Sequence, residues 1–92
     1  MGHLANEKAK LVNRLKRMRG QIDAIERAVA ADMDCIKVLQ QATSCRGALD
    51  GFIAEVIEHY IREHVIDQSK PGNDPHSQAA DDLIDIVHAY IT

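Results

Sequence analysis

A regular row of apolar residues near the amino end constrains the fold more than any other feature of this sequence. The row advances by alternating steps of four and three residues: Leu11, Leu15, Met18, Ile22, Ile25 and Val29. This heptad spacing puts its members on one face of a helix and is typical of a helix that packs along another helix. It predicts an amphipathic helix over residues 6–30.

A second, longer apolar pattern predicts a helix over residues 35–64. Its arc is wide enough to contact more than one helix and comprises Ile36, Leu39, Ala42, Leu49, Phe52, Ile53, Val56, Ile57, Tyr60 and Ile61. Because the break between the two helices is short, they should form an antiparallel hairpin, with Asp32 or Asp34 capping the second helix. Gly47 and Gly51 lie one turn apart, where we expect another backbone to approach closely.

The rest of the chain predicts a loop over residues 67–76 and a third helix, which starts at Asp74 or at Ser77 and runs to about Tyr90. A chain of 92 residues with 3% aromatic residues buries only a modest core alone. A hairpin with apolar residues on two sides is therefore incomplete by itself. We expect one all-α domain over residues 1–92, a three-helix protomer whose hairpin dimerises into a four-helix bundle, and a dimer of dimers.

Charge is divided unevenly along the chain. Residues 1–20 hold six Lys and Arg against one acidic residue, whereas the remainder holds five against thirteen. The spacing of Lys10, Arg14 and Arg17 places them in a row on one helix face, where they could neutralise the phosphates of double-stranded DNA. The complete predicted DNA-binding set is Lys10, Arg14, Lys16, Arg17, Arg19 and Arg46. The alternative is a solvated helix face on a protein-interaction module that does not bind DNA.

The two cysteines have different predicted roles. Cys35 and Cys45 lie ten residues apart in one predicted helix, roughly 15 Å, which is too far for a disulfide. We therefore expect reduced thiols in a cytoplasmic protein with no membrane partner, since no signal peptide or transmembrane segment is apparent. The amino end of a helix favours a thiolate at Cys35, whereas Cys45 is interpreted as a small apolar residue within the helix.

The histidines suggest a partner for Cys35, but only in a second copy of the chain. Cys35 and His64 are 29 residues apart on one predicted helix, roughly 44 Å, so they cannot share a site within one chain. If the second helices of two copies pack antiparallel, Cys35 of one copy can meet Tyr60, His64 and His3 of the other. A mixed Cys/His site of this kind would couple ligand binding to quaternary structure.

Three stretches of the sequence resemble the CsoR/RcnR/FrmR family of bacterial repressors. They are RLKRMRGQIDAI at residues 14–25, CIKVLQQATSCRGALDG at 35–51 and EVIEHYIREHV at 55–65. The resemblance implies a disc-shaped tetramer that binds operator DNA and is released from it by an effector. An enzyme is not expected, because no nucleophile–base pair, phosphate-binding loop or carboxylate pair is apparent.

The resemblance also implies a choice of effector. Copper(I) sensors carry Cys where this chain has His64, which argues against copper(I). Nickel and cobalt sensors use an amino-terminal His, a Cys and two His one turn apart; this chain offers His3, Cys35 and His64, with Tyr60 at the fourth place. His59 is an alternative ligand, although it lies about 100° from position 60 around the helix. We therefore expect nickel or cobalt, with zinc as a further choice.

Formaldehyde is the alternative effector. Formaldehyde sensors resemble this chain through Cys35 and the amino terminus, whose amine could form a methylene bridge to the thiol. The amine would be that of Gly2 if Met1 is removed. A repressor of this kind would need no metal ion.

Overall fold

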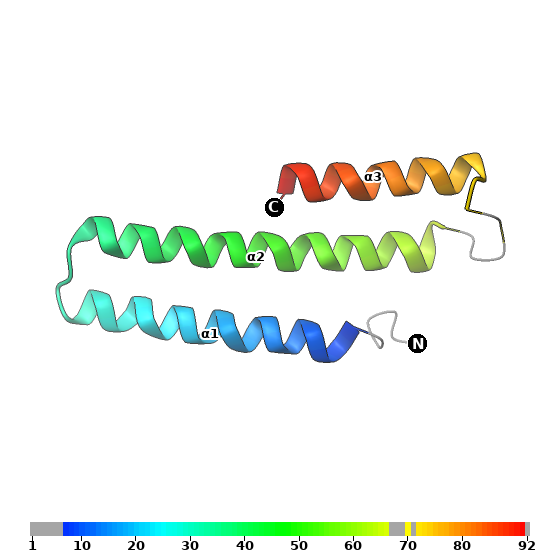
Figure 1. Ribbon diagram of the computed structural model, residues 1–92. Helices are drawn as coiled ribbons and strands as arrows, with labels where there is room; N and C mark the ends of the chain where they lie inside the picture. Colours follow the sequence, from blue (N-terminus) through cyan, green and yellow to red (C-terminus); the bar gives the residue numbers. More distant parts are fainter. Residues whose placement is uncertain (1–6, 67–69, 71, 92) are drawn as a thin grey trace.

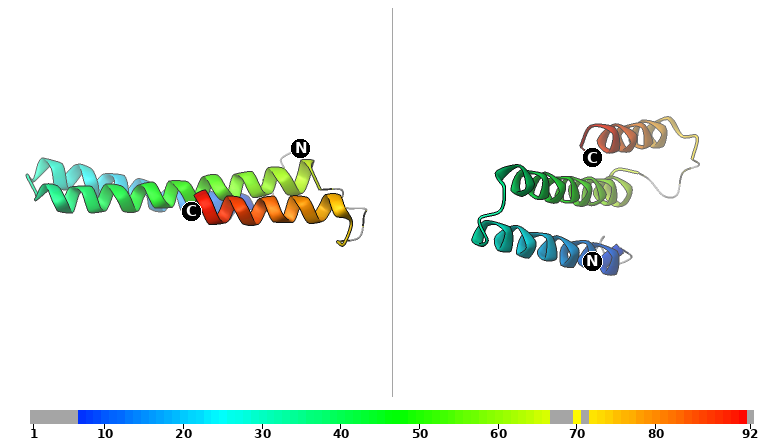
Figure 2. Two further views of the ribbon diagram at one scale, coloured as in Figure 1. Left: turned by 90° about the horizontal axis from the view of Figure 1, so that it is seen from above. Right: turned by 60° about the vertical axis from the view of Figure 1, so that its left-hand side comes forward.

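Three helices lie side by side in the described part of the protein. The computed structural model describes residues 7–66, 70 and 72–91, and over those residues it contains α1 (Lys8–Ala30), α2 (Cys35–His64) and α3 (Pro75–Ile91) without any strand. Figure 1 shows α2 between α1 and α3, each running antiparallel to it. The shortest dimension is 12 Å, about the diameter of one helix with its side chains, so the helices form a single layer (Figure 2). The all-α fold and the hairpin are confirmed.

The turn between α1 and α2 is fixed by local hydrogen bonds. Asp32 adopts a left-handed conformation with φ of 54°, which Asp tolerates better than most residues. The amide of Met33 donates to the Ala28 carbonyl at 3.0 Å, and the Asp34 carboxylate accepts from the Ile36 amide at 3.1 Å. Asp34 is therefore the cap of α2, whereas Asp32 forms the turn.

The start of α3 is fixed in a similar way. The Asp74 carboxylate accepts hydrogen bonds from the amides of His76 and Ser77, at 3.1 and 3.3 Å. Pro75 occupies the first helical position, where its missing N–H costs nothing. Of the two predicted starts, Asp74 is confirmed, and the predicted loop over 67–76 ends two residues too late. The helix then packs on α2 through a cluster of Ile57, Ile61, Ile66, Ala80 and Ile84.

The heptad row of α1 contains both buried and exposed residues, and Ile25 is half-buried. Leu11 and Met18 are buried between the helices, whereas Leu15, Ile22 and Val29 are exposed. The physical reason is the single layer, in which α1 has a neighbour on one side only. The heptad spacing thus marks a wide apolar face on α1, and α2 of the same chain buries only part of that face.

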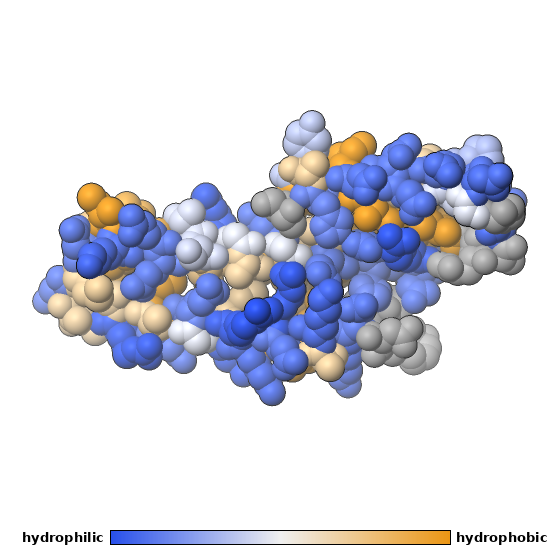
Figure 3. Space-filling model, viewed as in Figure 1, coloured by the Kyte–Doolittle hydropathy of each residue, from blue (hydrophilic) through white to orange (hydrophobic). Residues whose placement is uncertain are grey.

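The exposed apolar residues continue along the other two helices. Leu39 is 64% exposed, and the exposed large apolar residues among those that the structure describes are Val12, Leu15, Ile22, Val29, Met33, Ile36, Leu39, Leu49, Ile53, Tyr60, Val65, Leu83, Ile86 and Tyr90. Figure 3 shows apolar residues gathered near the α1–α2 turn and along α3. We call Ile36, Leu39, Leu49, Ile53 and Tyr60 the α2 stripe. None of the helices in the described ranges is long and apolar enough to cross a membrane.

Candidate effector site and nucleic-acid interface

Cys35 is an exposed thiol at the first residue of α2. It lies in an open groove of about 450 Å³ whose lining is Val29, Asp32, Met33, Cys35, Val38 and Leu39. Apart from Asp32 and the thiol itself, these side chains are apolar. Cys35 is therefore accessible to a ligand in a setting where few polar side chains compete for it. Cys45 is less exposed and lies within the helix.

The predicted histidine partner lies at the opposite end of α2. The rings of Tyr60 and His64 are stacked at a tilt, with centroids 4.7 Å apart and planes at 43°. Figure 1 shows the two ends of α2 far apart, consistent with roughly 44 Å for 29 helical steps. Across residues 7–66, 70 and 72–91, no three His, Cys, Asp or Glu side chains gather as a metal-holding group within one chain.

The structure places His59 on a different side of α2 from Tyr60. The His59 Nε2 atom is 3.9 Å from Glu7 Oε1, so its ring faces α1, and its side chain is 17% exposed. It lines a small charged cavity of about 200 Å³ together with Glu7, Lys10, Glu55, Glu58 and Arg62. To join Tyr60 and His64, His59 would have to leave this position. The other two predicted effector residues, Gly2 and His3, lie outside the described residues.

Two of the predicted DNA-binding cations are held by one carboxylate of α2. Glu55 Oε1 is 3.3 Å from Lys10 Nζ and 3.4 Å from Arg14 Nη2. Sequence reasoning missed Glu55, although a usable signal was present. Residues equally far from the turn at 32–33 face one another in an antiparallel hairpin, which pairs position 10 with 55 and position 14 with 51.

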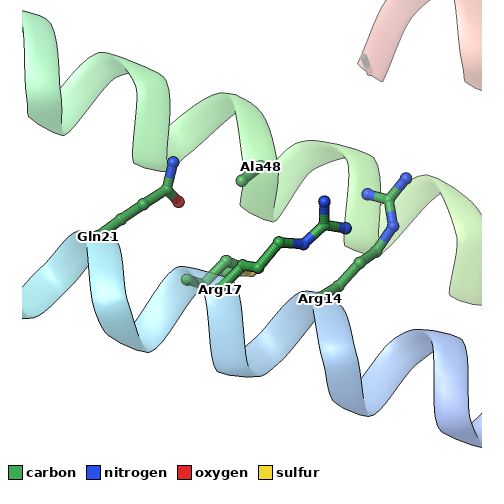
Figure 4. A pocket seen from close by; sticks show the side chains of 5 residues that line it. Arg14, Arg17, Gln21 and Ala48 are labelled. Carbon is green, nitrogen blue, oxygen red and sulfur yellow. The ribbon is translucent and has the colours of Figure 1, made fainter.

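Gly51 provides the space in which the Arg14 guanidinium lies. A Cβ atom at Gly51 would come within 2.8 Å of Arg14 Nη1, whereas one at Gly47 would meet nothing within 4 Å. The predicted close approach is therefore made by a side chain and not by a backbone, and only at Gly51. Beside it, Figure 4 shows Arg14, Arg17 and Gln21 reaching from α1 toward α2, with Ala48 of α2 between Gln21 and Arg14; these residues line a cleft of about 250 Å³.

The remaining predicted cations lie on exposed positions. Lys16 lines an open groove on α1 with Lys8 and Val12, not the cleft that contains Arg14 and Arg17. The basic surface therefore wraps around α1, and it includes Lys8, which the sequence-based set omitted. Within the described ranges, no ion pair holds the exposed side chains of Lys16, Arg17, Arg19 and Arg46.

Comparison with known proteins identifies the family to which the chain belongs. The family model described as metal-sensitive transcriptional repressor matches residues 7–89. The chain belongs to this family. Its members are transcriptional repressors, so the chain is a DNA-binding repressor and not an enzyme. Membership confirms the resemblance to CsoR, RcnR and FrmR and favours a repressor over an interaction module that does not bind DNA.

Individual proteins are similar to this chain over most of its length. The transcriptional repressor RcnR of Salmonella paratyphi B is 31% identical over 91 residues, which is 99% of each chain. An uncharacterized protein from the bioA 5′ region of Serratia marcescens is 42% identical over 65 residues, 71% of each chain. A solved structure of a variant of the formaldehyde-responsive regulator FrmR from Salmonella enterica serovar Typhimurium superposes with a TM-score of 0.64 and 27% identity, covering 92% of this chain and 94% of that one.

Proposed function

We propose that this repressor is a homo-oligomer whose operator binding is released by nickel or cobalt, bound between Cys35 of one copy and His64 of another. The observation that carries the proposal is the α2 stripe, an exposed apolar strip with Cys35 near one end and Tyr60 and His64 at the other. If two α2 helices pack antiparallel along this stripe about a centre near Leu49, position 35 of each copy faces position 64 of the other. One chain offers half of each site.

The exposed apolar face supports the oligomeric part of the proposal. Leu15, Ile22 and Val29 of α1 lie unburied in the same hairpin as the α2 stripe, and a second hairpin would cover both in a four-helix bundle. Leu83, Ile86 and Tyr90 form another exposed apolar set on α3. A dimer of dimers would cover that set as well.

The chemistry of the donors supports a transition metal. A Cys thiolate and a His imidazole are ligands that nickel, cobalt and zinc share. Cys35 and His64 would supply these two donors, His3 a third, and Tyr60 lies in contact with His64. His59 could join this set of metal ligands only if its ring moved away from Glu7. The bound metal would join two copies in a geometry that the metal-free oligomer need not adopt, which is how a ligand shifts a quaternary equilibrium.

A metal titration tests the proposal. Adding nickel(II) or cobalt(II) should produce a thiolate-to-metal charge-transfer absorption and release the promoter DNA of the regulated gene. Cys35→Ala and His64→Ala should each abolish both signals, whereas Cys45→Ala, a matched thiol deletion on the same helix, should preserve them. If nickel, cobalt and zinc all leave the DNA affinity unchanged, the proposed metal site is wrong. If zinc alone releases the DNA, zinc takes the place of nickel or cobalt in the proposed site.

For the DNA-binding face, we propose phosphate contacts from Lys10, Arg14, Lys16, Arg17, Arg19 and Arg46. Most of these side chains are exposed, and all except Arg46 of α2 lie on α1. Each phosphate contact adds about 0.9 to the slope of log affinity against log salt. Arg17→Gln should lower this slope by about one, because it removes one such contact. If Arg17→Gln keeps the salt slope of the wild type, Arg17 does not contact a DNA phosphate.

Formaldehyde is a second candidate effector, favoured by the similarity to the formaldehyde-responsive regulator and by the exposed Cys35 thiol. The thiol and the amine of Gly2 would condense with formaldehyde to a sulfur–methylene–nitrogen bridge, releasing one water. Intact mass spectrometry should then show the gain of one carbon, absent from Cys35→Ala. If formaldehyde releases the DNA and metals do not, this candidate replaces the metal.

A further inference from the structure

We propose that Glu55 is an internal competitor of DNA: its carboxylate occupies Lys10 and Arg14 in the place of a phosphate and limits the affinity of the repressor for DNA. The proposal rests on the DNA-binding face described above. Its basis is the convergence of two α1 cations on a single oxygen, Glu55 Oε1, at 3.3 and 3.4 Å. The Glu55 side chain is only 17% exposed, so it sits behind the cations and not among them.

Burial distinguishes the two cations. The Lys10 side chain is 58% exposed, whereas that of Arg14 is 28% exposed and lies in the space left by Gly51. Gly51 and Glu55 are one helical turn apart, so the glycine opens the path by which the Arg14 guanidinium reaches the carboxylate. The sequence thus provides both the acceptor and the space for the cation.

A carboxylate and a phosphate offer the same kind of acceptor to a guanidinium or an ammonium group. A phosphate that binds Arg14 or Lys10 must therefore displace Glu55 or approach its negative charge. Because ion pairs between partly exposed side chains are weak, DNA can make this exchange, at a cost in affinity. Removing the carboxylate should release both cations and strengthen DNA binding.

The neighbouring carboxylates make different contacts. Glu58 Oε1 is 2.6 Å from His88 Nε2, a contact that joins α2 to α3, and Glu58 Oε2 is 3.0 Å from Arg62 Nε within α2. Glu7 lies 4.0 Å from Lys10, beyond the distance at which Glu55 holds it. Among the described residues, Glu55 is the carboxylate that pairs with both Lys10 and Arg14.

Two variants release the cations by different routes. Glu55→Gln removes the charge and keeps the shape of the side chain. Gly51→Ala leaves the charge unchanged and places a Cβ atom where it meets the far end of the flexible Arg14 side chain, which can move away. Ala is also a better helix former than Gly, so the second variant should fold well. Glu58→Gln is the matched control, because it removes one negative charge from the same small cavity without freeing Lys10 or Arg14.

The test is the affinity of the metal-free, full-length protein for a fluorescent duplex from its own promoter, measured by anisotropy over a series of salt concentrations. Glu55→Gln should bind about three- to tenfold tighter near 0.1 M salt and raise the salt slope by about one to two, one step for each freed cation. Gly51→Ala should change affinity in the same direction by a smaller factor, and Glu58→Gln by less than about twofold. Adding Arg14→Gln to Glu55→Gln should remove the part of the gain that comes from Arg14, about one unit of salt slope, and leave the part that comes from Lys10.

The outcomes separate this proposal from the one on which it rests. Weaker binding by Glu55→Gln would mean that Glu55 positions the cations for DNA, and a gain equal to that of Glu58→Gln would mean a general charge effect. Either result overturns the competition while leaving the DNA-binding face intact. If Arg14→Gln, Lys10→Gln and also Arg17→Gln, whose side chain Glu55 does not hold, all bind DNA as the wild type does, the proposed face itself is wrong.

Discussion

Replacing Leu39 by Ala tests whether the α2 stripe is covered by a second copy. Complete burial of a leucine side chain is worth about 1.5–3 kcal/mol. Leu39 is 64% exposed in the single chain, so about two thirds of that value, roughly 1–2 kcal/mol, remains to be gained when a partner covers it. A symmetric dimer contains the residue twice, so the change should cost about 2–4 kcal/mol of dimerisation free energy, which is about 30- to 700-fold in the dissociation constant.

Sedimentation velocity over a range of protein concentrations measures this dissociation constant. Gln40→Ala is the matched control, since Gln40 is the exposed neighbour of Leu39 and lies off the stripe. Both changes retain good helix formers, so α2 should persist in each variant. If Leu39→Ala associates as the wild type and Gln40→Ala do, the stripe does not form the interface.

Two further predictions concern the packing of α3 on α2. Ile61→Ala removes a buried side chain from the cluster with Ala80 and Ile84, and urea unfolding should show a loss of about 2–4 kcal/mol; a loss below 1 kcal/mol would mean that α3 is not packed there. The hydrogen bond from His88 lowers the pKa of Glu58, burial opposes this effect, and the hydrogen bond and charge of Arg62 add to it. A lowered pKa in the folded state gives stability that is present above the usual value of 4.5 and lost as the pH falls through the folded value, so the unfolding free energy should decline below about pH 4.5. Glu58→Gln should flatten that decline, and an unchanged pH profile would exclude the contribution.

The starts of α2 and α3 could be predicted because local chemistry fixes them, whereas α1, which has no side-chain cap, begins at Lys8 and not at the predicted residue 6. Asp34 and Asp74 accept hydrogen bonds from amides two or three residues ahead, and such caps depend on few neighbours. The division of the α1 heptad could not be predicted in the same way. The spacing predicts burial equally for Leu11 and Leu15, but only Leu11 is buried in the single chain. Periodicity does not show whether a residue packs against its own chain or against another copy.

The candidate site was predictable where a single helix determines the geometry. A continuous α2 separates Cys35 from His64, and the angle between successive helical residues turns His59 away from Tyr60. Contacts between helices were harder to predict, because they depend on the register of one helix against the other. Counting outward from the turn at 32–33 would have paired Lys10 with Glu55, but a basic row on α1 does not by itself reveal the carboxylate opposite it.

Complementation between two inactive copies tests directly whether Cys35 of one copy and His64 of another form one metal site. Neither Cys35→Ala nor His64→Ala should show the nickel or cobalt charge-transfer band alone. When the two variants are mixed, unfolded and refolded together, a mixed dimer contains one site with both Cys35 and His64 and one with neither. The band should return at about half intensity per mixed dimer, because one of its two sites is intact. No band in verified mixed oligomers would contradict a site shared between copies.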